Sequence, residues 1–95
     1  MKEVPKLVYT KQKDLERLEA RIGQLPDEAI VRVQLLNGQQ VEGVVSVRPS
    51  MQVFRNDEGV EGFNAVVRID DRKDPARAYY LWMDQIDEIL RLGSD

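Results

Sequence analysis

Apolar and polar residues alternate with a period of two in the middle of the chain, which predicts a β-hairpin over residues 30–47. Val31 and Val33 are separated by the polar residue Arg32, as in a strand that buries one face. Asn37-Gly38 follows and favours a type I′ turn, because these residue types tolerate the positive φ angles that such a turn requires. The pattern therefore centres the predicted fold on two antiparallel strands.

The second strand of this hairpin contains Gly43, which shares one face with Val41, Val45 and Val47. A glycine inside a strand marks a sharp bend or a close approach by another backbone. Later segments with strand character are 51–55, 63–69 and 77–83, each bounded by turn residues or a proline. The last apolar segment, 86–92, fits either a helical turn or a strand, and we interpret it as a turn followed by a short strand.

A period of 3.6 residues ahead of the hairpin predicts an amphipathic helix in the region 10–25. Thr10 is the expected N-cap, and Gly23 with Pro26 ends the helix. The apolar stripe also has the spacing of a coiled-coil seam, but it spans only about two heptads, so we expect it to pack on the core of the same chain. The stripe consists of Leu15, Leu18, Ile22 and Leu25.

These elements predict a mainly β domain in which an N-terminal helix precedes a small five-stranded, strongly bent barrel. Ninety-five residues are too few for two independent cores. The expected organisation of this single domain, residues 1–95, is an extended lead-in at 1–9, the helix at 10–25, and the barrel at 29–92 with an inserted loop at about 49–62.

The amino-acid composition limits the cellular compartment and the kinds of partner that we expect. The chain has 14 basic and 17 acidic side chains, a net charge of −3, and no cysteine. Disulfides and thiolate chemistry are therefore excluded, and we expect a cytoplasmic protein. No apolar run approaches the roughly 20 residues that span a bilayer, and the first residues lack the apolar core of a signal peptide, so we expect no membrane partner.

Candidate catalytic chemistry is sparse. Without histidine or cysteine, a catalytic centre would need paired carboxylates, a metal, or an activated hydroxyl or amine. The local acidic cluster is Asp70, Asp71 and Asp74, whose oxygens suit a hard cation. Because Arg72 and Lys73 lie in the same loop, we interpret the cluster as a solvated turn rather than a metal site. We expect no catalytic residues, no cofactor and no small-molecule substrate.

The segment from Val33 to Val45 resembles the first motif of the Sm-like (LSm/Hfq-like) family. In that motif an Asn-Gly or Asp-Gly turn leads into a strand that bends at a glycine. The matching residues here are Asn37, Gly38 and Gly43. The resemblance implies an Sm-like, that is SH3-like, barrel behind the N-terminal helix.

Two further segments are similar to later parts of the family motifs. Residues 63–67, Phe-Asn-Ala-Val-Val, resemble the end of the first motif after an insertion. Residues 81–89 resemble the second motif, an apolar-Arg-Gly segment followed by spaced aliphatic residues. The resemblance covers about residues 10–92 and indicates a small bacterial Sm-like family of uncharacterised function rather than Hfq itself.

The resemblance implies a candidate RNA site. In family members that bind uridine-rich RNA, an asparagine reads the base edge while an aromatic side chain and an arginine stack on the base. The reader maps to Asn64, the stacking position to Gly62, and the arginine position to Trp82, which can itself stack on a base. The candidate RNA-binding residues are therefore Asn64, Trp82 and the adjacent Phe63. The alternatives are a core or subunit contact for Trp82 and a backbone hydrogen bond for Asn64.

The expected function is that of an Sm-like binding module for single-stranded RNA with a degenerate base pocket. The alternative is a protein-interaction or assembly module that does not bind RNA. The resemblance also implies self-association through the last two strands, because such barrels form rings by pairing the fourth strand of one subunit with the fifth of the next. Tyr79, Tyr80 and Trp82, in the predicted fourth strand, are candidate interface anchors.

Overall fold

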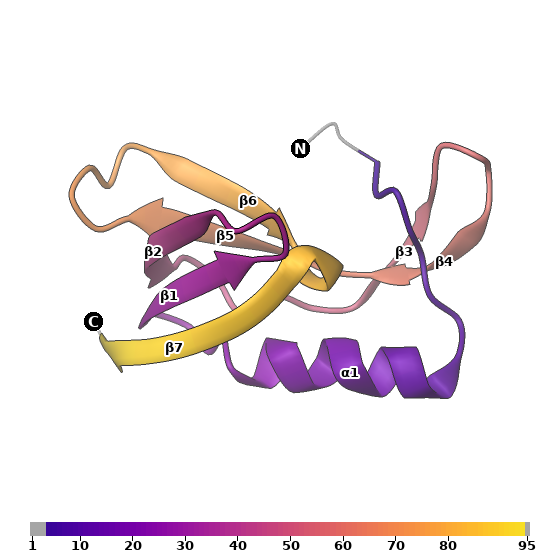
Figure 1. Ribbon diagram of the computed structural model, residues 1–95, viewed down its shortest axis with the longest axis horizontal. Helices are drawn as coiled ribbons and strands as arrows, with labels where there is room; N and C mark the ends of the chain where they lie inside the picture. The colour runs from indigo at the N-terminus through magenta and orange to yellow at the C-terminus, as the bar shows by residue number, and fades with distance from the viewer. Residues whose placement is uncertain (1–3, 95) are drawn as a thin grey trace.

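The computed structural model describes residues 4–94, so the predictions for residues 1–3 and 95 lie outside the described part of the chain. Within that part the chain forms one α-helix, seven β-strands and one 3-10 turn, with the helix along one side of a twisted sheet and a separate hairpin at one end (Figure 1). The elements are α1 (Gln12–Gly23), β1 (Ala29–Leu35), β2 (Gln40–Val45), β3 (Gln52–Arg55), β4 (Glu61–Asn64), β5 (Val66–Asp71), β6 (Ala78–Trp82), η1 (Met83–Gln85) and β7 (Ile86–Ser94).

Five of the seven strands form the main sheet, in the order β6-β5-β2-β1-β7, and all neighbours are antiparallel. The pairing of β1 with β7 contains register shifts, and such bulges increase the twist and bend the strand. Over residues 4–94, β6 and β7 are the two edges of this sheet and do not pair with each other. The predicted closure into a barrel is therefore wrong, because the bent sheet stays open.

The strand predicted over 63–69 is divided between two sheets, and seven strands form instead of the predicted five. Asn64 ends β4, and its side-chain Oδ1 accepts a hydrogen bond from the N–H of Ala65 at 2.8 Å. Both residues are fully buried, so the alternation of buried and exposed positions breaks between them. β4 pairs with β3 in a hairpin, whereas β5 belongs to the main sheet. The region expected as an inserted loop, 49–62, thus holds β3 and the beginning of β4.

The C-terminal strand is longer than predicted. η1 supplies the expected turn, but β7 then runs for nine residues and pairs with β1 along the length of that strand. The consecutive residues Asp87 and Glu88 are both exposed, so the first half of β7 lacks the alternation that marks a strand in the sequence.

The central hairpin turn includes Asn37 and Gly38, but it is not the predicted type I′ turn. Gly38 has a φ of +89°, whereas Asn37 has no positive φ, and type I′ requires both. Leu35 accepts a hydrogen bond from the N–H of Gly38 at 2.9 Å and donates its own N–H to the Gln39 carbonyl at 2.8 Å. These contacts are typical of a three-residue hairpin loop in which one left-handed glycine forms a bulge.

α1 begins slightly later than predicted, and its N-cap is Lys11 rather than Thr10. Lys11 has extended backbone angles, and its carbonyl accepts hydrogen bonds from the N–H groups of Asp14 and Leu15. Thr10 lies one residue too early to cap the first turn, and no side-chain cap bond forms. The helix ends at Gly23, as the sequence predicts.

The hydrophobic core lies between α1 and the sheet. A helix of 12 residues is marginal alone in water, so burial of its apolar stripe holds it in place. Alternate positions of β1, β2 and β5 supply the other side of the core, and η1 closes one end. The core includes Leu18, Ile22, Leu25, Ala29, Val31, Val33, Val41, Val45, Val67, Ile69, Met83 and Ile86.

Replacement of Gly43 by alanine should destabilise the fold, because β2 and β5 approach each other closely at this residue. An added Cβ would lie 2.1 Å from the Asp70 carbonyl oxygen and 2.8 Å from Ile69 Cγ2. We expect Gly43→Ala to lower the free energy of unfolding by about 2–3 kcal/mol, measured by urea denaturation. The matched control is Gly23→Ala, where no atom lies within 4 Å of the added Cβ. Equal stabilities of the two variants would contradict this account.

Candidate functional site

The segments that resemble the two Sm-like motifs meet where β4 passes into β5. Val66, at the start of β5, is the strand partner of Trp82 at the end of β6. The side-chain amide of Asn64 donates a hydrogen bond to Asp84 Oδ1 at 3.3 Å. The antiparallel pairing of β5 with β6 therefore brings the predicted residue Asn64 against η1, the turn that follows Trp82.

Asn64 is fully buried, and its side-chain polar atoms are bonded within the chain. Nδ2 donates to the Leu7 carbonyl at 3.0 Å and to Asp84, while Oδ1 accepts from Ala65. The bonds to Leu7 and Ala65 are hydrogen bonds to the backbone. Such bonds are the alternative role that we gave Asn64 from the sequence. Its role as a base reader stays a prediction, and that role would require the lead-in, which carries Leu7, to move away.

The two predicted aromatic residues have different surroundings. Trp82 is half-buried and packs edge-to-face on Phe54 of β3, with ring centroids 5.0 Å apart and an interplanar angle of 83°. Phe63 lies on β4 opposite Val53 and is 36% exposed. Because adjacent strand residues point to opposite faces, the side chains of Phe63 and Asn64 diverge. The ring that packs on Trp82 in this structure is therefore Phe54.

The site also holds a polar pair that the sequence did not predict, Tyr9 and Asp84. The hydroxyl of Tyr9 donates to Asp84 Oδ2 at 3.0 Å, and both side chains are half-buried. Burial of the phenol, reinforced by the negative charge of Asp84, raises the pKa of Tyr9 to about 12. The available signal was the position of Asp84 inside the second motif, whereas nothing in the charged lead-in pointed to Tyr9.

A small recess of about 190 Å³ lies beside the Tyr9–Asp84 bond, between α1 and η1. Its volume is below the range of roughly 300–1,000 Å³ that is typical of small-molecule sites. A recess of this size can accommodate at most one side chain of a partner. Apolar and charged residues line it together: Tyr9, Asp14, Arg17, Leu18, Arg21, Leu36, Asp84 and Ile86.

A larger open groove of about 530 Å³ lies beside β7, one of the two edge strands. The Arg21 guanidinium, near the end of α1, donates to the Asp87 carbonyl at 3.0 Å and so covers the start of this edge. Farther along β7, Leu90 and Leu92 are exposed, as is Tyr80 on the opposite edge strand, β6. The groove is lined by Arg21, Gln24, Arg32, Gln34, Gln40, Asp87, Glu88, Ile89 and Leu90.

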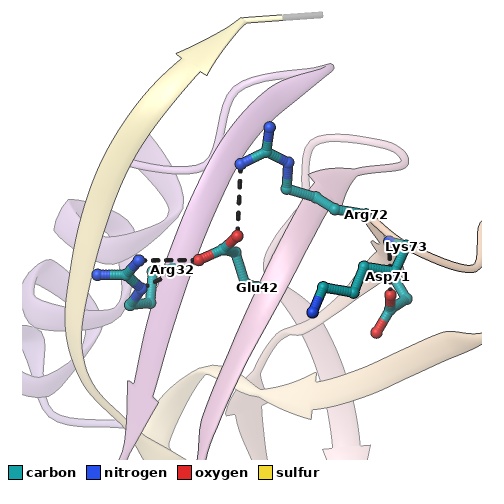
Figure 2. Close-up of polar contacts among 5 residues, drawn as sticks. All are labelled: Arg32, Glu42, Asp71, Arg72 and Lys73. Carbon is teal, nitrogen blue, oxygen red and sulfur yellow. Dashed lines mark hydrogen bonds and ion pairs between the residues drawn. The ribbon is translucent and has the colours of Figure 1, made fainter.

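Charged side chains on the solvent side of the sheet pair with one another (Figure 2). Glu42 on β2 accepts hydrogen bonds from Arg32 at 3.0 Å and from Arg72 at 3.3 Å. In the adjacent loop Asp71 accepts from the backbone N–H of Lys73 at 2.8 Å, and such bonds hold the pKa of Asp71 below its usual value. The acidic loop is therefore a hydrogen-bonded turn.

Residues 4–94 contain neither a candidate metal cluster nor a membrane-spanning helix. No group of three or more histidine, cysteine, aspartate or glutamate side chains is arranged to hold a metal ion. No helix in this part of the chain is long and apolar enough to cross a bilayer. The absence of a metal and of catalysis stays a prediction.

Comparison with known proteins identifies one family and one solved relative. The model of a domain of unknown function, DUF3247, matches residues 2–92. A crystal structure from Xanthomonas campestris, described as adopting a novel variant of the Sm-like motif, is 32% identical in sequence, with a TM-score of 0.84. The match covers 95% of this chain and 97% of the Xanthomonas chain. No curated protein matches the sequence.

The hydrogen bond from Tyr9 to Asp84 should stabilise the fold below pH 10 and lose this effect as the pH rises towards 12. The folded chain holds the pKa of Tyr9 at about 12, above the ordinary value of 10, so the phenol of the unfolded chain ionises first. We expect Tyr9→Phe to lower the free energy of unfolding at pH 8 by about 1 kcal/mol. Its difference from the wild type should shrink between pH 10 and 12, as measured by urea denaturation.

Tyr80→Phe is the control for this experiment, because Tyr80 is 51% exposed. It should leave the free energy of unfolding unchanged throughout the same pH range. A difference between Tyr9→Phe and the wild type that does not depend on pH would show that the hydroxyl stabilises the fold in another way.

Proposed function

Because the chain belongs to the DUF3247 family and has a solved Sm-like relative, we propose that it is a non-enzymatic, cytoplasmic protein-interaction module that self-associates through β6 and β7. The observation that carries the proposal is the open sheet: within residues 4–94, β6 pairs only with β5, and β7 only with β1. Strand edges with unpaired backbone groups are templates for pairing with another chain.

Each edge also carries exposed apolar surface. Tyr80 on β6 is 51% exposed, and Leu90 and Leu92 on β7 are 54% and 39% exposed. Pairing β6 of one copy with β7 of the next would bury these side chains and satisfy both edges. Such a contact joins two different surfaces, and its repetition gives a ring if the rotation between copies closes.

Two arginines define which part of β7 is open to a partner. Arg21 donates to the Asp87 carbonyl at 3.0 Å, and Arg91 Nε donates to the Gly93 carbonyl at 3.3 Å. The stretch between these carbonyls, residues 88–92, is about as long as the five-residue β6. This match in length supports β6 of a second copy as the occupant, in preference to a longer strand.

The geometry gives less support to RNA. Asn64 is buried and bonded to the lead-in, so the predicted base reader is occupied in this structure. The net charge is −3 and provides no excess of basic groups for phosphates. RNA binding through Asn64, Trp82 and Phe63 therefore stays a prediction from the resemblance.

The proposal predicts a wild-type particle heavier than the 11.0 kDa monomer in size-exclusion chromatography with light scattering. Leu90→Lys and Tyr80→Lys should each shift the mass towards the monomer, because a charge would be buried in the strand pairing. Val47→Lys is the matched control, since Val47 is 67% exposed and lies outside both edge strands. A wild type that remains monomeric at the highest attainable concentration would overturn the proposal.

A fluorescently labelled uridine-rich oligonucleotide should show no rise in anisotropy with micromolar protein, even at low salt, where phosphate contacts are strongest. The same titration with a folded Trp82→Leu variant tests the alternative. A rise with the wild type that this variant loses would favour the RNA site implied by the resemblance.

A further inference from the structure

The described part of the lead-in, residues 4–9, runs past β4 and forms an isolated β-bridge with it between Tyr9 and Phe63 (Figure 1). The N–H of Tyr9 donates to the Phe63 carbonyl at 2.9 Å, and the N–H of Phe63 donates to the Tyr9 carbonyl at 2.8 Å. This is the reciprocal pair of bonds by which an extended peptide joins a sheet edge. The chain's own segment 5–9 is therefore held at the edge of β4, with its backbone pairing at Tyr9.

Two side chains of the body recognise this segment beyond its backbone pairing. The buried amide of Asn64 donates to the Leu7 carbonyl at 3.0 Å. Asp84 accepts the Tyr9 hydroxyl at 3.0 Å and also the amide of Asn64, so both carboxylate oxygens are bonded. A partner needs a carbonyl for Asn64 and, two residues later, a phenol for Asp84.

The shape of the groove is also specific. Gly62 forms part of its floor, and an added Cβ there would lie 3.0 Å from the Tyr9 carbonyl oxygen and 3.0 Å from Val8 Cβ. Pro5 is almost fully buried at the other end of the segment. In contrast, Leu7 is 54% exposed, so its side chain adds little to recognition.

The lead-in and α1 are held by different backbone hydrogen bonds. Its last bond to β4 is at Tyr9, whereas the first turn of the helix is closed by bonds to the Lys11 carbonyl. Thr10 and Lys11 between them are exposed. Release of the lead-in would therefore break no hydrogen bond of α1, although it would uncover the core residues on which Tyr9 packs.

We propose that the groove formed by β4 and η1 is a recognition site for an extended, tyrosine-containing peptide segment of a partner protein, with residues 5–9 as an intramolecular competitor. The partner has the form of the resident segment, a proline followed four residues later by a tyrosine. The site goes beyond the proposed self-association, because it uses β4 rather than the edges β6 and β7. Failure of one proposal leaves the other intact.

The test uses the full chain with a weakened resident segment. In Tyr9→Ala the lead-in loses its bond to Asp84, so a fluorescein-labelled peptide with the sequence of residues 4–10 should bind at least about tenfold more tightly than to the wild type. A peptide with phenylalanine in place of tyrosine should bind about tenfold more weakly, the effect of one hydrogen bond to a charged group. Fluorescence anisotropy measures both affinities, and circular dichroism checks that the variant is folded.

Two further variants localise the binding. Gly62→Val in the Tyr9→Ala background should abolish binding by filling the groove. Asp84→Asn in the same background should reduce the preference for tyrosine over phenylalanine, which a general loss of stability would not do. If Tyr9→Ala does not fold, Tyr9→Phe keeps the ring and serves instead with the same peptides.

Three results would overturn the proposal. The first is no saturable binding of the tyrosine peptide to the folded variant. The second is equal affinity for the variant and the wild type. The third is equal affinity for the tyrosine and phenylalanine peptides, which would place binding away from Asp84.

Discussion

The buried side-chain amide of Asn64 connects three segments that are far apart in the sequence. It bonds to Leu7 in the lead-in, to Ala65 at the entry to β5 and to Asp84 in η1. Leaving such an amide buried without partners costs about 1–3 kcal/mol, so a peptide carbonyl must meet it in the folded chain, and Leu7 supplies that carbonyl here. The same contacts divide β4 from β5 and bring the lead-in over the site.

Local sequence patterns predicted the structure correctly where residues close together in the sequence determine it. The alternation around Val31 and Val33 predicted β1, and the Gly23 stop predicted the end of α1. Gly43 was interpreted from sequence as a sharp bend or a point of close approach by another backbone, and the close neighbour, the Asp70 carbonyl, lies in a distant strand. Even at the hairpin, the residues of the turn were predictable while its type was not.

The parts that the sequence could not predict depend on contacts across the chain. Tyr9 and Asp84 are separated by 75 positions and form no local pattern. The apolar run at 63–69 looked continuous because its break comes from the buried amide of Asn64 rather than from a glycine or proline. Closure of the sheet was overestimated for a related reason, since strand number in a sequence says nothing about whether the edges meet.

The ion pairs that the arginines form bear more directly than the net charge on the choice between a nucleic acid and a protein as the partner. Exposed ion pairs add little to stability, but each places a carboxylate where a phosphate would have to bind. A nucleic acid would therefore compete with internal acidic partners at these positions, whereas a strand or peptide would need only backbone groups and apolar surface. The open edges and the β4 groove offer those groups, which supports the proposal of a protein partner. The arginines in ion pairs are Arg17, Arg32, Arg55, Arg68 and Arg72.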